Sequence, residues 1–308
     1  MDVVVVGQVG RDLVLRVGGV PGAGGSAPVR GRVEVLGGKG ANQAVACAQL
    51  GLAVGLVGVV GDDRAADDVL AQARADGIDV RHVVRRAGAA TALLLDVVAD
   101  GGERRLLEHV ADDVLLRPAD VRSAAGAVRG ARAVLLQLQQ PAPAIGAALD
   151  ACGPDALVVA DGAPQDDGLR ERLVATAHVL RADAAEAGVL VGRPVGGVAA
   201  GVEAARELVA RGPRVVALEA GDANVVAWDG GHVVVPLLGG APVDPTGAGD
   251  SFVGGLTAAL LAGHDPATAG WWASAAAAST VGRLGGRPDL DPGRLADAAR
   301  RARVHHGG

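Results

Sequence analysis

The most informative stretch of the chain is Val243-Asp-Pro-Thr-Gly-Ala-Gly-Asp-Ser-Phe252, a glycine-rich turn that runs directly into an Ala- and Leu-rich segment. The small residues at 247–249 allow successive backbone N–H groups to face a ligand at the start of a predicted helix. Free amides and the helix dipole together bind anions. Asp250 would lie in the first turn, where its carboxylate could accept a proton from a hydroxyl beside a bound phosphate. An Asp in the first turn also favours any helix, so the local pattern alone leaves an ordinary helix start open.

A second glycine-rich turn, Gly37-Gly-Lys-Gly-Ala-Asn-Gln-Ala44, opens another predicted helix. Its polar side chains, Lys39, Asn42 and Gln43, together with the close approach that glycine permits, suit a ligand with several hydroxyl groups. The turn is not a phosphate-binding P-loop, because Lys39 lacks the four-residue spacer and the following Ser or Thr. A dinucleotide-binding fold is also disfavoured, because Gly7-Gln-Val-Gly10 lacks the third glycine at the required spacing.

From residue 118 the chain alternates between helical and strand-like segments, which is typical of βαβ units in a parallel sheet with helices on both faces. Short apolar runs at 3–6 and 54–60 indicate two more buried strands. The remaining predicted strands are 133–138, 156–160, 178–181, 214–219 and a hairpin at 223–228 and 231–235. The predicted helices are 40–51, 63–76, 118–129, 142–151, 168–175, 184–191, 199–211, 248–263, 266–282 and 291–302. The sequence therefore predicts an α/β fold with a doubly wound, mostly parallel sheet.

Glycine-punctuated segments at about 11–36 and 91–110 do not follow this alternation. Within the second, residues 92–98 and 104–109 flank Asp100-Gly-Gly102, a hairpin signal. We expect these segments to form a small β-sheet lid on a single domain that spans 1–308. Flat strands with exposed edges also suggest a homodimer in which two lids pair.

The composition excludes several classes of function. The net charge is −6, and the charges are of mixed sign without a basic block, so neither nucleic acid nor an anionic membrane is an expected partner. The apolar run at the amino terminus is four residues long, and no 18-residue apolar run is free of Gly, Pro or charge. The two cysteines, Cys47 and Cys152, have no metal-site spacing. We therefore expect a cytoplasmic protein that acts on small molecules.

The two glycine-rich turns carry a family resemblance. Residues from 243 through Thr257 resemble the carboxyl-terminal signature of the phosphofructokinase-B (PfkB) carbohydrate kinases. Residues 37–44, with Gly51 and Gly61 downstream, resemble the family's amino-terminal signature in the form found in ribokinases. The signatures stand about 200 residues apart in the expected order, and the resemblance covers residues 1–302. It implies a ribokinase-like fold and transfer of the γ-phosphate of ATP to a primary hydroxyl of a pentose such as ribose.

The resemblance also implies roles for particular residues. Asp250 would be the general base, and the amides of Gly247, Ala248 and Gly249 would stabilise the transferring phosphoryl group. The sugar would be bound by Asp12, Gly38, Lys39, Asn42, Gln139 and Asp250. ATP would be bound by Asp183, Glu219, Gly221, Gly249 and Ser274. A monovalent cation, usually K⁺, would be held by Asp244, Thr246, Thr280, Arg283, Gly285 and Asp289, and Glu186 would orient Mg²⁺-bound water.

The chain departs from the ribokinase pattern at the sugar wall and the nucleotide rim. Gln139 replaces a Glu that reaches the sugar, Asp161 and Gly10 each replace an Asn, Asp183 replaces the Asn of Asn-x-x-Glu, and Glu219 replaces a Thr. These departures leave other acceptors open: a nucleoside, deoxyribose or a sugar phosphate. They are also compatible with a second interpretation, in which the protein is a relative of these kinases that binds sugar or nucleotide without catalysis.

Overall fold

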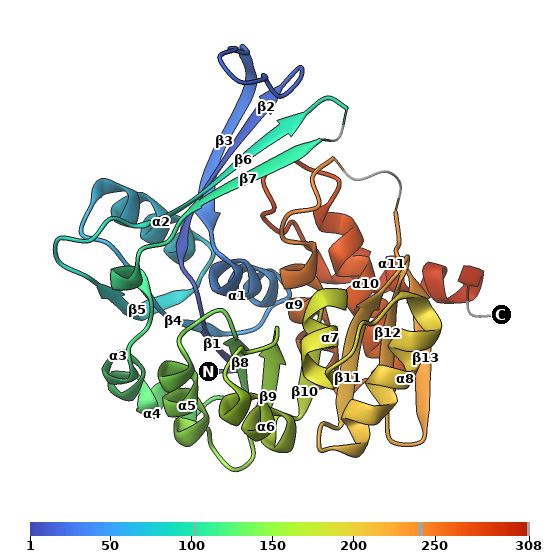
Figure 1. Ribbon diagram of the computed structural model, residues 1–308. Coiled ribbons are helices and arrows are strands. Elements are labelled where there is room, and N and C mark those ends of the chain that lie inside the picture. The colour runs from blue at the N-terminus through green and yellow to red at the C-terminus, as the bar shows by residue number, and fades with distance from the viewer. Residues whose placement is uncertain (102, 240–242, 307–308) are drawn as a thin grey trace.

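In the computed structural model, which describes residues 1–101, 103–239 and 243–306, the chain is built on a nine-stranded sheet (Figure 1). The strand order is β13 (Gly231–Pro236), β12 (Ala223–Trp228), β11 (Val215–Ala220), β10 (Val179–Ala182), β9 (Leu157–Asp161), β8 (Ala133–Gln137), β1 (Val3–Val6), β4 (Val54–Val60) and β5 (Asp79–Arg85). The strands from β11 to β5 are all parallel, whereas β12 and β13 form the antiparallel edge. The predicted α/β fold is therefore confirmed.

Helices cover both faces of this sheet, because its strands are apolar on both sides. In β1, for example, Val3 and Val5 enter one core cluster and Val4 and Val6 enter the other. The first face is covered by α1 (Lys39–Gln49), α2 (Arg64–Ala75), α9 (Ala248–Leu261) and α10 (Pro266–Thr280). The opposite face is covered by α3 (Pro118–Ser123), α4 (Ala125–Arg129), α5 (Ala142–Ala151), α6 (Asp167–Thr176), α7 (Ala184–Val191) and α8 (Gly197–Ala210). The last helix, α11 (Pro292–His306), packs on α10.

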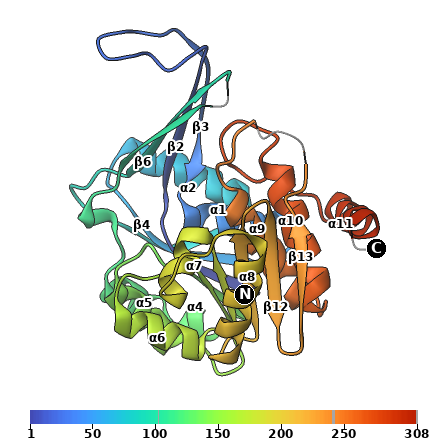
Figure 2. The same cartoon turned by 45° about the vertical axis from the view of Figure 1, so that its right-hand side comes forward.

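A second, four-stranded sheet rises from the carboxyl edge of the main sheet and leans over it (Figures 1 and 2). Its order is β3 (Val29–Gly37), β2 (Gly10–Val17), β6 (Ala92–Ala99) and β7 (Arg104–His109). The two hairpins are antiparallel, but their central strands, β2 and β6, pair in parallel. We call these strands the small sheet. Its use as a lid, and the treatment of 1–308 as one domain, stay predictions; Gly102, in the predicted hairpin turn, lies outside the described residues.

A helix and a strand differ from the sequence-based expectation, and a short 3₁₀ helix, η1 (Asp112–Val114), was not predicted. The predicted helix at 118–129 is divided at Ala124, which ends α3 and precedes α4. Strand β5 was not predicted, because Asp79–Arg85 alternates charged and apolar residues and gives no continuous apolar run. It is an edge strand of the main sheet and is only partly buried, as its composition requires.

Glycines set the start of α1 against the end of β1. A Cβ atom at Gly40 would lie 2.6 Å from the carbonyl carbon of Gly7, so only glycine permits this contact. Gly38, just before the helix, has a φ of 86°, which glycine adopts without strain. Strand β1 lies between β4 and β8, so the strand order extends from β1 first to one side (β4 and β5) and later to the other (β8 to β13). In parallel α/β sheets such a switch point is where ligands bind, beyond the carboxyl ends of the strands.

Among the described residues, none of the helices is both long and apolar enough to cross a bilayer.

Candidate active site

A cavity of about 400 Å³ opens at this switch point, between the first turns of α1 and α9 and the inner side of the small sheet. We call it the first cavity. All six predicted sugar-binding residues line it: Asp12, Gly38, Lys39, Asn42, Gln139 and Asp250. The small sheet contributes Leu94, Asp96, Arg104, Leu106 and Glu108. Residues that are distant in the sequence therefore meet in one enclosure.

The carboxylate of Asp250 is buried at the bottom of the first cavity, in the first turn of α9. Its two oxygens accept hydrogen bonds from Asn42 Nδ2 at 3.3 Å and from Gln43 Nε2 at 3.2 Å, both on α1. Burial, followed by the negative charge of Asp161, raises the pKa of Asp250 to about 6. At neutral pH this carboxyl group is therefore mostly ionised and basic enough to accept a proton from a bound hydroxyl.

The start of α9 is fixed by a backbone contact that only glycine allows. Gly247, the residue before the helix, has a φ of 72°, and a Cβ atom there would lie 1.8 Å from the carbonyl oxygen of Gly286. The first N–H groups of a helix have no partner within the helix and carry partial positive charge. Gly247 and Gly249 both line the first cavity, so this helix start faces the same space as Asp250.

Two buried oxygen atoms in the first cavity have no donor among the described residues. They are Asp12 Oδ1 and Asn42 Oδ1. The side chain of Asp12 lies over Gly37, where a Cβ atom would come within 1.9 Å of the carboxylate. Buried acceptors are normally paired, so a ligand that brings hydroxyl donors would satisfy them. A polyhydroxyl compound fits this requirement.

Asp12→Asn is expected to stabilise the protein at pH 8. Burial raises the pKa of Asp12 to about 7, with a further contribution from the charge of Asp96. Because the folded chain holds this proton more tightly than the unfolded chain, the free energy of unfolding falls as pH rises from about 4 to 7. That rise in pKa corresponds to roughly 4 kcal/mol at most, part of which a neutral Asn would recover.

Thermal unfolding of this variant at pH 5 and pH 8 provides the measurement. The gain should be larger at pH 8 than at pH 5, and Asp68→Asn, an exposed change on α2, should produce neither. Destabilisation of Asp12→Asn at pH 8 would contradict the prediction.

A second cavity, of about 360 Å³, lies on the other side of Gly249. Within the described part of the chain, four residues line both cavities and separate them: Arg181, Glu219, Pro245 and Gly249. The rest of the second cavity is mainly apolar and includes Phe252, the only Phe of the chain. Of the predicted nucleotide-binding residues, Glu219, Gly249 and Ser274 line it. Gly221 lies in the exposed turn between β11 and β12 and lines neither cavity.

Asp183 and Glu186 cap the start of α7 and bind each other reciprocally. Asp183 Oδ1 accepts from the amide of Glu186 at 2.8 Å, and Glu186 Oε2 accepts from the amide of Asp183 at 2.9 Å. This capping box explains why an acidic residue is tolerated at 183. The second oxygen of Glu186 lies 3.9 Å from Lys39 Nζ, and Asp183 lines the first cavity. Both carboxylates therefore stand beside the predicted sugar-binding lysine.

The predicted cation ligands fall into two groups. Asp244 is fully buried: its oxygens accept from the Thr246 amide and hydroxyl, at 2.9 and 2.6 Å, and from the Gly285 amide at 2.9 Å. These bonds tie the loop before α9 to the loop after α10. Thr280 lies nearby in the core, hydrogen-bonded to Ser251 at 2.6 Å. By contrast, the side chains of Arg283 and Asp289 form an ion pair at the surface.

Sequence reasoning gave no role to Arg181 or to the pair of Arg104 and Asp96. Arg181 lies in β10 with its guanidinium buried between the two cavities, 3.2 Å from Asp161 and 3.6 Å from Glu219. On the small sheet, Arg104 Nε donates to Asp96 Oδ1 at 2.6 Å. An Arg within the apolar run of residues 179–182 was the available signal, since charged residues in buried strands are rare unless they are paired.

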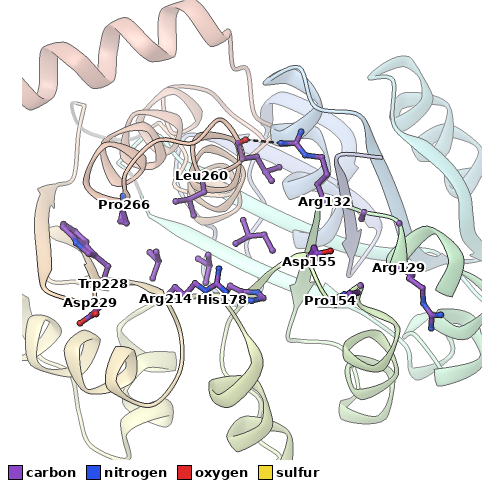
Figure 3. A pocket seen from close by; sticks show the side chains of 18 residues that line it. Arg129, Arg132, Pro154, Asp155, His178, Arg214, Trp228, Asp229, Leu260 and Pro266 are labelled. Carbon is purple, nitrogen blue, oxygen red and sulfur yellow. Dashed lines mark hydrogen bonds between the residues drawn. The ribbon is translucent and has the colours of Figure 1, made fainter.

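A larger cavity, of about 720 Å³, lies at the opposite, amino-terminal edge of the main sheet (Figure 3). There Arg132 Nη2 donates to the carbonyl oxygen of Leu261 at 3.2 Å, and His178, Arg214 and Trp228 line the wall. None of the predicted site residues reaches this cavity. Because ligands of open α/β sheets bind beyond the carboxyl ends of the strands, the first cavity is the better candidate despite its smaller volume.

Comparison with known proteins decides the family. A model described as "pfkB family carbohydrate kinase" matches residues 1–292 of the chain. The chain belongs to the pfkB family of carbohydrate kinases. The resemblance inferred from the two glycine-rich turns is thereby confirmed.

Relatives of this kinase point to the ribokinase branch. Ribokinase of Bacillus subtilis strain 168 is 30% identical over 293 residues, which cover 93% of the chain and 96% of that protein. ATP-dependent ribose-1-phosphate kinase of Halopiger xanaduensis is 32% identical over 285 residues, covering 91% and 92%. The structure of Arabidopsis thaliana ribokinase complexed with ribose and ATP superposes with a TM-score of 0.75 at 22% identity, covering 97% of each chain, and shows the same fold. The kinase is a ribokinase-type, ATP-dependent carbohydrate kinase.

Proposed function

We propose that the kinase transfers the γ-phosphate of ATP to the primary hydroxyl of a pentose such as ribose, with Asp250 as the general base. One observation carries the proposal. The buried carboxylate of Asp250, at the amino terminus of α9, faces the same cavity as the two buried acceptors that lack donors, Asp12 Oδ1 and Asn42 Oδ1. A proton acceptor, an anion-binding helix start and acceptors for hydroxyl groups are thus combined in one small space.

The geometry suggests how each group would act. Asp12 and Asn42 would accept hydrogen bonds from sugar hydroxyls and orient the sugar, so that its primary hydroxyl meets Asp250. The amides of Gly247, Ala248 and Gly249 would stabilise the negative charge of the phosphoryl group as it moves. Asp250 would take the proton late, because a loose transition state needs little early deprotonation. The small sheet would cover the sugar and limit the access of water.

Charge favours a neutral sugar over a phosphorylated one. The first cavity is lined by six carboxylates, Asp12, Asp96, Glu108, Asp183, Glu219 and Asp250, and by three cations, Lys39, Arg104 and Arg181. The acidic side chains therefore outnumber the basic ones, and an acceptor that carries its own phosphate would add further negative charge to the cavity. The alternative is a sugar phosphate, as the name of the Halopiger relative suggests for that protein. Arg104 is the residue that favours it, although Asp96 already neutralises its charge.

Two metal ions fit the residues present. Asp183 lines the first cavity and is bonded to Glu186, whose other oxygen lies 3.9 Å from Lys39 Nζ, and these carboxylate oxygens would suit Mg²⁺ bound through water. Asp244 is fully buried and accepts only from neutral donors among the described bonds, so its charge suits a neighbouring K⁺. Thr246, the end of α10 at Thr280 and the following loop with Arg283, Gly285 and Asp289 would complete the site, mostly through backbone carbonyl groups. Bound Mg²⁺ would neutralise phosphate charge, and K⁺ would stabilise the loops around the helix start.

A substrate panel tests the proposed function. ADP formation is measured with ribose, 2-deoxyribose, ribose 1-phosphate and a nucleoside, each with and without K⁺. We expect ribose to give a kcat/KM at least about tenfold above the others, since each lost or misplaced hydroxyl leaves a buried acceptor unpaired. The product with ribose should be the 5-phosphate. A clear preference for ribose 1-phosphate would select the alternative acceptor, and ADP formation with none of the compounds would contradict the proposal.

We also propose a homodimer formed through the small sheet. Its edge strands carry the exposed residues Val29 and Leu107, 51% and 58% accessible, on a sheet whose outer strands have unpaired edges. Sedimentation velocity at micromolar concentration is the test. A single monomeric species would rule out this dimer under those conditions.

A further inference from the structure

Arg181 occupies the boundary between the two cavities. It lies at the carboxyl end of β10, is 8% exposed and lines both spaces. Its guanidinium rests directly on the first turn of α9: a Cβ atom at Gly249 would lie 2.8 Å from Arg181 Nη2 and 3.0 Å from Nη1. The absence of a side chain at Gly249 is what permits this approach.

The bonds found for Arg181 leave part of its hydrogen-bonding capacity unused. Nη1 donates to Asp161 Oδ1 at 3.2 Å, and Nη2 lies 3.6 Å from Glu219 Oε2, beyond normal hydrogen-bond length. Glu219 is 44% exposed, so water weakens that attraction. A guanidinium has five N–H donors in a planar fork that matches the oxygens of a phosphate. Arg181 therefore keeps donors for a ligand that crosses the boundary.

The group that crosses the boundary is defined by the proposed function, on which this inference rests. In the transfer, the bond between the γ-phosphorus and the β–γ bridging oxygen breaks, and a bond from the same phosphorus to the sugar oxygen forms. The electron pair leaves with ADP, and the sugar proton passes to Asp250. Only the γ-phosphoryl group moves between the nucleotide side and the sugar side, and its equatorial oxygens carry the charge at mid-transfer.

We propose that Arg181 is a catalytic residue whose guanidinium contacts the γ-phosphoryl group during transfer and neutralises its charge, together with the backbone amides of 247–249. Sequence position alone would not suggest this role, because Arg181 stands nearly 70 residues from α9. The role follows from the contact of its guanidinium with Gly249 and from its place in both cavity walls.

A positioning role is the competing explanation. Gln43 Nε2 donates to both Asp161 Oδ2, at 2.8 Å, and Asp250 Oδ1, at 3.2 Å. Arg181 could therefore act only through Asp161, by compensating its charge and keeping Gln43 in place. Loss of Arg181 would then leave Asp161 uncompensated, and the negative charge of Asp161 already raises the pKa of Asp250. This explanation predicts that the acid limb of the pH–rate profile moves to higher pH.

Four variants separate these roles: Arg181→Gln, Asp161→Asn, the double variant, and Arg132→Gln as a matched control at the opposite edge of the sheet. Turnover is measured with the best acceptor of the panel. We expect Arg181→Gln to lower kcat by about 10²- to 10³-fold with a KM for sugar within a few-fold of the unmodified kinase. Arg132→Gln should leave kcat unchanged.

The double variant decides between them. Removing Asp161 as well restores charge balance, so the acid limb should return toward its original position. If Arg181 acts on the phosphoryl group, kcat of the double variant should still be about 100-fold below that of Asp161→Asn. Equal kcat values for these two variants would overturn the proposal. This comparison also holds if the single Arg181→Gln variant fails to fold, because the double variant removes the buried Asp161 carboxylate together with its partner and leaves only the half-exposed Glu219 without Arg181.

A binding measurement gives a readout independent of turnover. ADP with aluminium fluoride imitates the transferring group, so Arg181→Gln should bind this complex about 100-fold more weakly while its affinity for ADP stays within a few-fold. An equal loss of affinity for both ligands would contradict the inference, and so would an unchanged affinity for both. Failure of the proposed pentose specificity would appear instead in the panel with the unmodified kinase.

Discussion

Asp250→Asn is expected to lower kcat by about 10³-fold while the fold stays intact. The amide has the shape of the carboxylate but keeps only one acceptor oxygen, so Asn42 or Gln43, which both donate to Asp250, must turn its own amide oxygen toward the new N–H; the amide cannot accept the proton of the attacking hydroxyl. A positioned general base contributes about 10²- to 10⁴-fold to a rate. The KM values for sugar and ATP should change much less, because the lost interaction acts mainly in the transition state.

The pH dependence supplies the control. The pKa of Asp250 is raised to about 6, so kcat of the unmodified kinase should fall as pH decreases through 6 and Asp250 becomes protonated. The small residual activity of Asp250→Asn should lack this acid limb. Because burial disfavours the ionised carboxylate, the variant should also melt no lower than the unmodified kinase at pH 8. A kcat within tenfold of the original would exclude Asp250 as the base.

Gly247→Ala should remove most activity by displacing the start of α9. The added Cβ would lie 1.8 Å from the carbonyl oxygen of Gly286, and the backbone φ of 72° is itself unfavourable for alanine. The overlap can be relieved only if the backbone at 247 or at 286 moves. A forced overlap of this kind in a packed interior lowers the free energy of unfolding by about 1 to 3 kcal/mol or more. The amides at 247–249 would move with it, away from the phosphoryl group.

Gly263→Ala, at the other end of the same helix, is the matched control. Gly263 has a similar φ of 84°, but nothing lies within 4 Å of an added Cβ. The control should therefore lose about 1 kcal/mol of stability from backbone strain and keep its kcat. Chemical unfolding and steady-state kinetics of both variants give the comparison. Equal effects at the two ends would show that the contact with Gly286 does not hold the helix start.

The main sheet was predictable from the sequence because its parallel strands are buried on both faces and read as apolar runs. Residues 3–6 and 54–60 are the clearest cases. Strand β5 failed this test, since an edge strand needs no continuous apolar run. The division of 118–129 into α3 and α4 at Ala124 was not predicted because Ala124 is a good helix former and the nearby Gly126 lies within α4 rather than at the break.

Site residues within the glycine-rich turns were predictable from the sequence. Site residues that the fold brings together from distant parts of the chain were not. The glycine-rich turns identified Asp250, Lys39 and Asn42, and these residues do line one cavity. Arg181 escaped notice because its importance arises from the approach of a strand end to a helix start distant in sequence. Conversely, Gly221 was included because residues 218–221 resemble the nucleotide-binding strand and loop of the family, but Gly221 lines neither cavity.

The thin partition at Gly249 has a stereochemical consequence. Among the residues that the structure describes, four border both cavities: Arg181, Glu219, Pro245 and Gly249. The one carboxylate among them, Glu219, lies beside Arg181 and is half open to solvent, so none of the four is poised to carry a covalent phosphate. A phosphoryl group that passes this partition would go from donor to acceptor in a single displacement. The configuration at phosphorus would therefore be inverted once, whereas two displacements through a phospho-enzyme would give net retention.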